Sequence, residues 1–161
     1  MDLTSRILVA CVGNVLRMDD GFGCAVAARL GELPAGVEVL ETGIGGITIV
    51  QELMAGCDGL IVVDAVDRGA PAGTLFELRP EVGDAVHVAD VHLANPDRVL
   101  SMAKTMGALP GRMRIVGCQP AEVDELAGPL SPPVAAAVAP AAASVRRIVD
   151  LWLREAAHAG L

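Results

Sequence analysis

Short runs of consecutive apolar residues alternate along the chain with segments whose apolar residues recur at helical spacing. The runs predict buried strands at 7–12, 37–40, 59–63 and 112–117, and weak alternation at 74–78 predicts an edge strand. Helical spacing predicts helices at 20–30, 47–55 and 96–107. Strands that alternate with helices imply right-handed crossovers and a mostly parallel, twisted sheet. We therefore expect an α/β fold: a single-domain three-layer αβα sandwich over residues 1–161, with about five strands and helices on both faces.

The C-terminal part of the chain predicts a long amphipathic helix from about residue 134 to 157. Its apolar positions include Val138, Val145 and Trp152, and arginines occupy other positions. The segment 130–143, rich in Ala and Pro, is expected to start this helix, with a disordered linker as the alternative. Pro140 leaves the start of the helix open, because proline removes a helical hydrogen bond.

Composition narrows the class of protein. Hydrophobic residues make up 53% of the 161 positions and aromatic residues only 2%, so the core must consist of Val, Leu, Ile and Ala. The net charge of −8 disfavours nucleic acid as a partner and favours basic ones. The four cysteines have no CxxC spacing, which indicates buried thiols rather than a disulfide scaffold or a zinc knuckle. With no signal peptide and no apolar run long enough to span a bilayer, we expect a cytoplasmic protein that does not act at a membrane.

Two loops at strand ends carry unusual polar content. The first is 13–23, with Asp19 and Asp20, and the second begins at Asp64. In an open parallel sheet, ligands bind beyond the carboxyl ends of the strands, so these carboxylates should face one cleft if their strands are neighbours. The simpler alternatives are that Asp19 or Asp20 caps the first helix and that Asp64 braces a loop. Asp58 and Asp67 are expected to be solvated turn residues.

Histidine could complete a metal site. His87 and His92 lie on opposite sides of an extended chain and should not bind one ion together. His92 is the better candidate because it precedes the helix at 96–107, although a surface role for it stays open. Two carboxylates with one imidazole suit a borderline divalent metal such as nickel or zinc. The sequence has no HExxH, GxSxG or Walker motif, and its glycine pairs lack the third glycine of a dinucleotide fingerprint.

The first loop resembles the signature of the hydrogenase maturation proteases. The pattern is Gly13-Asn14-x-Leu16-x-x-Asp19-Asp20-Gly21-x-Gly23, after a strand. Further segments resemble the family in order along the chain: Leu40-Glu41-Thr42-Gly43 with Gly46, Val63-Asp64-Ala65, and His92 through Leu100. The resemblance covers roughly residues 6–155. It departs from the family at Glu41-Thr42, where Asp-Gly-Gly is usual, and this departure bears on substrate specificity.

The resemblance implies an activity and a site. The family cuts the C-terminal extension from the precursor of a nickel–iron hydrogenase large subunit that is already loaded with nickel. The matching metal-binding and catalytic residues are Asp20, Asp64 and His92, and Glu41 has a lesser expected role. Nickel is expected to arrive on the precursor, and another divalent metal could occupy the site in vitro. The expected partner is that precursor, and the expected oligomeric state is a monomer.

Three other classes of function are compatible with parts of the sequence. A non-proteolytic metal-binding chaperone for the same precursor would share the whole site. A small binding module for a nucleotide or an acidic metabolite would need a phosphate fingerprint that is missing, and the acidic cleft would repel its ligand. A hydrolase of another substrate on a similar fold would need a different set of catalytic residues.

Overall fold

The computed structural model describes residues 5–43, 46–83, 96–121 and 128–160. Five strands form one sheet in the order β2-β1-β3-β5-β4. They are β1 (Ile7–Val12), β2 (Val37–Gly43), β3 (Gly59–Ala65), β4 (Leu75–Leu78) and β5 (Arg112–Cys118). β1 pairs in parallel with β2 and β3, β3 pairs in parallel with β5, and β4 runs antiparallel to β5 at the edge. The predicted mostly parallel sheet with an edge strand at 74–78 is confirmed.

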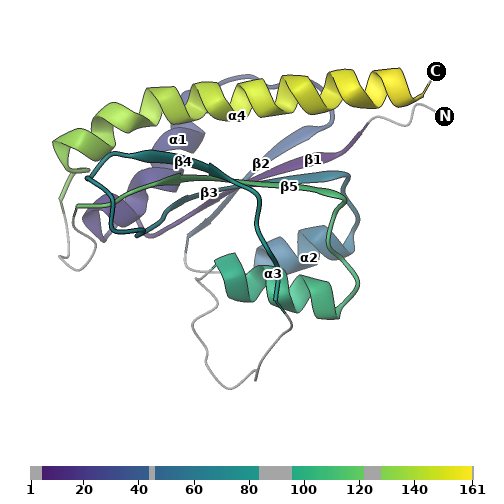
Figure 1. Cartoon of the computed structure of the whole chain (residues 1–161), viewed down its shortest axis with the longest axis horizontal. Coiled ribbons are helices and arrows are strands. Elements are labelled where there is room, and N and C mark those ends of the chain that lie inside the picture. The colour runs from purple at the N-terminus through teal and green to yellow at the C-terminus, as the bar shows by residue number, and fades with distance from the viewer. Residues whose placement is uncertain (1–4, 44–45, 84–95, 122–127, 161) are drawn as a thin grey trace.

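Helices cover both faces of this sheet (Figure 1). One face packs against α1 (Phe22–Leu30) and α4 (Pro132–Ala159), and the other against α2 (Ile47–Met54) and α3 (Pro96–Thr105). Alternate residues of β1 enter the two cores, so that Val9 lies with α1 and α4 and Leu8 lies with α2 and α3. A strand buried on both faces needs apolar residues at every position, which is why β1 is a continuous apolar run. The three-layer sandwich is confirmed.

The long C-terminal helix is also confirmed, and it includes Pro140. α4 begins directly after Ser131 and runs for 28 residues, with Val138, Val145 and Trp152 on its buried side. Pro140 and Ala136 are both exposed. The carbonyl of Ala136 loses its helical partner to the proline on the solvent side of the helix, where water can replace it, and the helix therefore continues. Within the residues that the structure describes, no helix is both long and apolar enough to cross a membrane.

Most predicted ends lie within two residues of the observed ones, and three differences change where a candidate residue lies. A short 3₁₀ helix, η1 (Met18–Gly21), precedes α1, so Asp20 lies before the α-helix rather than in it. β3 continues past Val63 to Ala65, which places Asp64 inside the strand. β2 extends from the predicted Leu40 to Gly43, because it pairs with β1 as far as Val12. Pairing with a neighbouring strand sets the ends of β2 and β3, and the residue pattern of one segment carries little information about such pairing.

Two glycines allow the first loop to lie directly on the strand ends. A Cβ at Gly23 would lie 2.2 Å from the Val12 carbonyl oxygen and 2.8 Å from that of Val63. A Cβ at Gly13, where φ is +135°, would lie 1.9 Å from the Asp20 carbonyl oxygen. Only glycine permits such approaches of backbone to backbone. These contacts bring the start of α1 onto the carboxyl ends of both β1 and β3.

We predict that Gly23→Ala lowers the free energy of unfolding by roughly 2–3 kcal/mol, because its methyl group would overlap two backbone carbonyls that cannot both move aside. Gly111→Ala is the matched control, since a Cβ there meets nothing within 4 Å. It should change stability by less than about 0.5 kcal/mol. Urea unfolding followed by circular dichroism measures both. Equal effects of the two substitutions would contradict the close approach at Gly23.

Candidate active site at the carboxyl edge of the sheet

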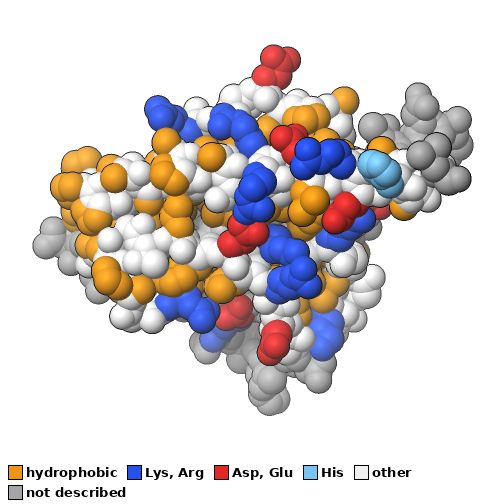
Figure 2. Space-filling model, turned by 45° about the horizontal axis from the view of Figure 1, so that its top comes forward, with side chains coloured by type: hydrophobic (Ala, Val, Ile, Leu, Met, Phe, Trp, Pro, Cys, Tyr) orange, Lys and Arg blue, Asp and Glu red, His pale blue; other side chains and the backbone are white. Residues whose placement is uncertain are grey.

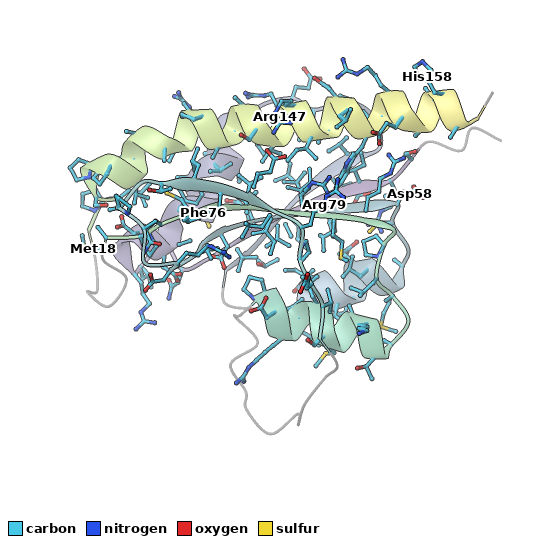
Figure 3. The ribbon with its side chains drawn as sticks, in the orientation of Figure 1. Met18, Asp58, Phe76, Arg79, Arg147 and His158 are labelled. Atoms are coloured by element: carbon cyan, nitrogen blue, oxygen red, sulfur yellow. The ribbon has the colours of Figure 1, made fainter. Side chains whose placement is uncertain are left out.

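The predicted acidic residues meet at one end of the sheet. The loop and η1 that carry Asp20 follow the carboxyl end of β1, and Asp64 lies near the carboxyl end of the neighbouring β3. Figure 3 shows this end by the label of Met18, close to the start of α4, while Asp58, just before β3, lies at the opposite end of the molecule. The sequence-based expectation that both segments face the same edge is confirmed.

Asp20 is half-buried and fixed by its own loop. Its Oδ2 accepts a hydrogen bond of 3.0 Å from the backbone N–H of Asn14. Its backbone N–H donates to the carbonyl of Arg17 at 3.0 Å. These two hydrogen bonds fix Asp20 against Asn14 and Arg17 of its own loop. The second carboxylate oxygen of Asp20 can take other partners.

Asp64 is nearly buried, with 6% of its surface exposed. Burial raises the pKa of this carboxyl well above its usual value, the negative charge of Asp20 raises it further, and a hydrogen bond from the backbone of Ala65 opposes the rise. The two carboxylates therefore act on each other across the site. Ionising both at neutral pH is costly unless a cation or a proton lies between them.

Asp19 has a different role from its neighbour, and sequence reasoning missed it. Its carboxylate is fully buried: Oδ1 accepts from the backbone N–H of Ser131 at 2.7 Å, and Oδ2 accepts from the Ser131 hydroxyl and the Ala121 N–H, both at 2.8 Å. These donors precede α4 and follow β5, more than a hundred residues away in sequence. Neither Asp19 nor Asp20 caps α1, since the N-cap is Gly21 and no side chain bonds there. Asp19 ties η1 to two other segments and so holds Asp20 in place.

Glu41 lies at the same edge, near the end of β2, and is exposed. It pairs with Cys11 of β1. Burial raises the pKa of the Cys11 thiol to about 12, with smaller contributions from Cys24 and Glu41. Burial also raises the pKa of Cys24, followed by the charges of Glu41 and Asp20. Both shifts favour the thiol over the thiolate, so this environment does not activate either cysteine as a nucleophile.

The third predicted ligand lies outside the described residues. This holds for His92 and for His87, so the structure gives them no place relative to the two carboxylates. Within the described ranges, no group of three or more His, Cys, Asp or Glu side chains gathers in a way that could hold a metal ion. The described part of the site is the Asp20–Asp64 pair, with Glu41 and Cys24 beside it.

The remaining polar residues singled out in the sequence have structural roles. Asp58 and Asp67 are exposed, as expected. Asp58 Oδ2 accepts from the backbone N–H of Arg6 at 2.8 Å. Asp67 Oδ1 accepts from Gln119 Nε2 at 2.8 Å, and the buried Gln119 also accepts from two backbone N–H groups of the loop after β3, those of Arg68 and Ala70.

We predict that Asp19→Asn lowers the free energy of unfolding by about 3 kcal/mol. Each carboxylate oxygen faces a backbone N–H, so the amide NH₂ of asparagine would meet a donor in either orientation. Ser131→Ala removes only the hydroxyl bond and should cost about 1 kcal/mol. Chemical denaturation of both variants measures the difference. A nearly neutral Asp19→Asn would show that the three hydrogen bonds do not hold this edge together.

We predict that Asp64→Asn stabilises the metal-free protein at pH 8 but not near pH 4. The pKa of Asp64 is higher in the folded protein than in the unfolded chain, where it is 3.8. As the pH rises from the lower to the higher of these two pKa values, the unfolded chain loses its proton more easily than the folded protein, so Asp64 increasingly destabilises the fold. Asparagine removes this penalty, and its oxygen can still accept the hydrogen bond from Ala65.

The control for this prediction is Asp67→Asn, which should have the opposite sign. The hydrogen bond from Gln119, followed by that from Gly69, lowers the pKa of Asp67, so its contribution is present above its unfolded pKa and is lost as the pH falls. Urea unfolding of both variants at pH 4 and pH 8 gives the comparison. The same pH trend in both variants would contradict the burial of Asp64.

Known proteins are similar to this chain in sequence and in fold. The family model described as hydrogenase maturation protease matches residues 25–148, a range that contains Asp64 and His92. The hydrogenase expression/formation protein HupD of Rhodobacter capsulatus is 37% identical over 153 residues, which cover 91% of this chain and 72% of the relative. The hydrogenase 2 maturation protease of Escherichia coli is 34% identical, over 95% of this chain and 99% of its own.

Solved structures agree with the sequence comparison. The hydrogenase maturating endopeptidase HybD from E. coli superposes with a TM-score of 0.76 and 31% identity, covering 94% of this chain and 93% of that one. Its fold therefore matches almost the whole chain. On the family model and on these relatives, the chain belongs to the hydrogenase maturation protease family.

Proposed function

We propose that this protein removes the C-terminal extension from the precursor of a [NiFe] hydrogenase large subunit that is already loaded with nickel. Asp20, Asp64 and His92 are its metal-binding and catalytic residues in this proposal. The observation that carries it is the meeting of Asp20 and Asp64 at the carboxyl edge of the sheet, in a chain of this protease family. We expect the reaction to take place in the cytoplasm, the location that the sequence analysis predicts.

The buried carboxylate supports recognition of a metal. Asp64 is kept in a setting where its negative charge is costly, and the charge of Asp20 adds to that cost. A divalent cation between them would offset both effects, which favours binding of a precursor that carries an ion over one that does not. Carboxylate and imidazole ligands suit nickel, and the same donors accept other divalent ions in vitro. Nickel is part of the substrate in this scheme.

Hydrolysis of the scissile amide needs a water molecule, a base that takes its proton, and stabilisation of the carbonyl oxygen. The substrate-borne cation can lower the pKa of bound water or polarise the carbonyl. The thiols of Cys11 and Cys24 are poor candidates for attack because their pKa values are raised. A carboxylate of the Asp20–Asp64 pair is therefore the proposed base, acting on water rather than forming a covalent intermediate.

We predict that Asp20→Asn, Asp64→Asn and His92→Gln each lower the rate of precursor processing by at least roughly a hundredfold while the protein stays folded. The assay incubates purified protein with nickel-loaded precursor and measures the product by mass spectrometry. A mass loss equal to a short C-terminal peptide shows cleavage. Nickel-free precursor should stay uncut, because it lacks the ion that the three residues bind.

Asp58→Asn and Asp67→Asn are the matched controls, since both exposed carboxylates lie outside the proposed site. They should process the precursor at the wild-type rate. Processing at the wild-type rate by all three site variants would refute the assignment of residues. Binding of nickel-loaded precursor by the wild-type protein without any mass loss would instead identify a metal-binding chaperone.

A further inference from the structure

We propose that Val15 and Leu16 form a docking surface for apolar side chains of the substrate polypeptide beside the scissile bond. The proposal rests on the proposed function and adds a determinant of specificity to it. Val15 and Leu16 lie between Asn14 and Arg17 in the loop after β1 and are called the Val15–Leu16 rim.

The rim is unusually apolar for an exposed loop. Val15 is 60% exposed and Leu16 is 64% exposed, the highest values among the large hydrophobic residues in the part of the chain that the structure describes. Isolated apolar side chains at a surface are common, but two adjacent ones at the edge of a candidate active site are a frequent sign of binding. Neither is needed for the cores, which are complete without them.

Hydrogen bonds hold the rim at a fixed position relative to the carboxylates. Asn14 Oδ1 accepts from the Leu16 N–H at 2.9 Å, and the Asn14 carbonyl accepts from the Arg17 N–H at 3.0 Å. The N–H of the same Asn14 donates to the carboxylate of Asp20 at 3.0 Å. Asn14 therefore connects the rim to Asp20 through its own backbone and side chain. A rim ordered before binding loses little conformational entropy when a substrate covers it.

The rim continues into an uncharged surface. A Cβ on Gly21 would lie 3.3 Å from Val15 Cα and 3.9 Å from Leu130 Cδ2, so the loop and the segment before α4 meet at Gly21, next to Asp20. From Ser131 to Val145 the chain has no charged residue, and Pro132, Pro133, Ala135 and Ala136 are exposed there. Figure 2 shows that the charged side chains of this face lie away from the end where α4 begins. On a chain with net charge −8, this is a notable stretch without charge.

These contacts indicate which part of the substrate would lie on the Val15–Leu16 rim. The substrate of a protease is a polypeptide, and its scissile bond must come within reach of Asp20 and Asp64. A chain at that point passes the rim, because Asn14 binds Asp20 directly and Val15 lies over Gly21. An apolar side chain next to the cut would cover Val15 and Leu16, whereas a polar one would lose water there without gaining a hydrogen-bond partner from these two side chains. The proposed occupant is therefore an apolar residue of the precursor within a few positions of the cut.

The experiment measures steady-state processing of nickel-loaded precursor by Leu16→Ser and Val15→Ser. Each substitution should raise KM by about tenfold with kcat little changed, since a lost apolar contact of one side chain weakens binding by this order. Met54→Ser and Met106→Ser are the matched controls. These methionines are 58% and 51% exposed and lie at the ends of α2 and α3, away from the carboxyl edge. Their KM should equal that of the wild type.

A change on the substrate tests the same contact from the other side. Replacing the apolar residues beside the cut with Ser, which adds no charge near the acidic pair, should raise KM for the wild-type protein and add little for Leu16→Ser, because the contact is already lost. Additive effects of the two changes would overturn the proposal. An unchanged KM for both rim variants, with the wild type still cleaving, would also overturn this proposal but would leave the proposed function intact.

If the wild type binds the precursor but does not cleave it, the proposed function fails and binding alone decides the inference. Weaker binding by Leu16→Ser than by Met54→Ser would then support the docking surface. Equal binding would reject it. Circular dichroism of each variant confirms folding before either comparison.

Discussion

The position of the acidic residues at this edge of the molecule depends on the close approach of the first loop to the ends of β1 and β3. Gly23 lets α1 start against the carbonyl groups of Val12 in β1 and Val63 in β3. Gly13 lets the backbone of Asp20 pack directly against the residue that follows β1. A side chain at either position would push the loop outward. Asp20 would then lose contact with the charge of Asp64, and Asn14 would lose its bond to Asp20. A backbone contact made possible by the absence of two side chains thus sets the geometry of the acidic pair.

The structure holds the carboxyl group of Asp64 where its negative charge is unfavourable, and interactions elsewhere keep the protein folded. Asp64 lies in a strand that is buried along nearly its whole length, where most positions are Leu, Ile or Val. Its neighbour Asp20 adds repulsion rather than relief. The cost is offset elsewhere, by two apolar cores and by the fully satisfied carboxylate of Asp19. Such a conflict between local stability and the placement of a charge is common at functional sites, where perturbed pKa values serve the chemistry of the site.

Sequence reasoning predicted most of the fold and part of the site. The strands were predictable because parallel strands covered on both faces must be apolar at nearly every position, as in β1 and β3. The meeting of Asp20 and Asp64 was predictable from the rule that loops at carboxyl ends of neighbouring strands share one edge. The role of Asp19 was not, because its partners Ser131 and Ala121 are distant in sequence and both donate through backbone N–H groups, which leave no trace in residue type. The ends of β2 and β3 were missed for a related reason, since pairing with β1 and β5 extends them.

The buried carboxylate of Asp19 has a consequence for how such a protein can diversify. It receives hydrogen bonds from Ala121 and from Ser131, which stand on either side of residues 122–130. Ala121 and Ser131, at the two ends of that stretch, are therefore both fastened to the carboxylate of Asp19. Insertions or replacements inside the stretch carry only a small entropic cost of loop closure and leave the two fastening points in place. Changes within this stretch of sequence can thus leave Asp19, and with it η1 and Asp20, in position.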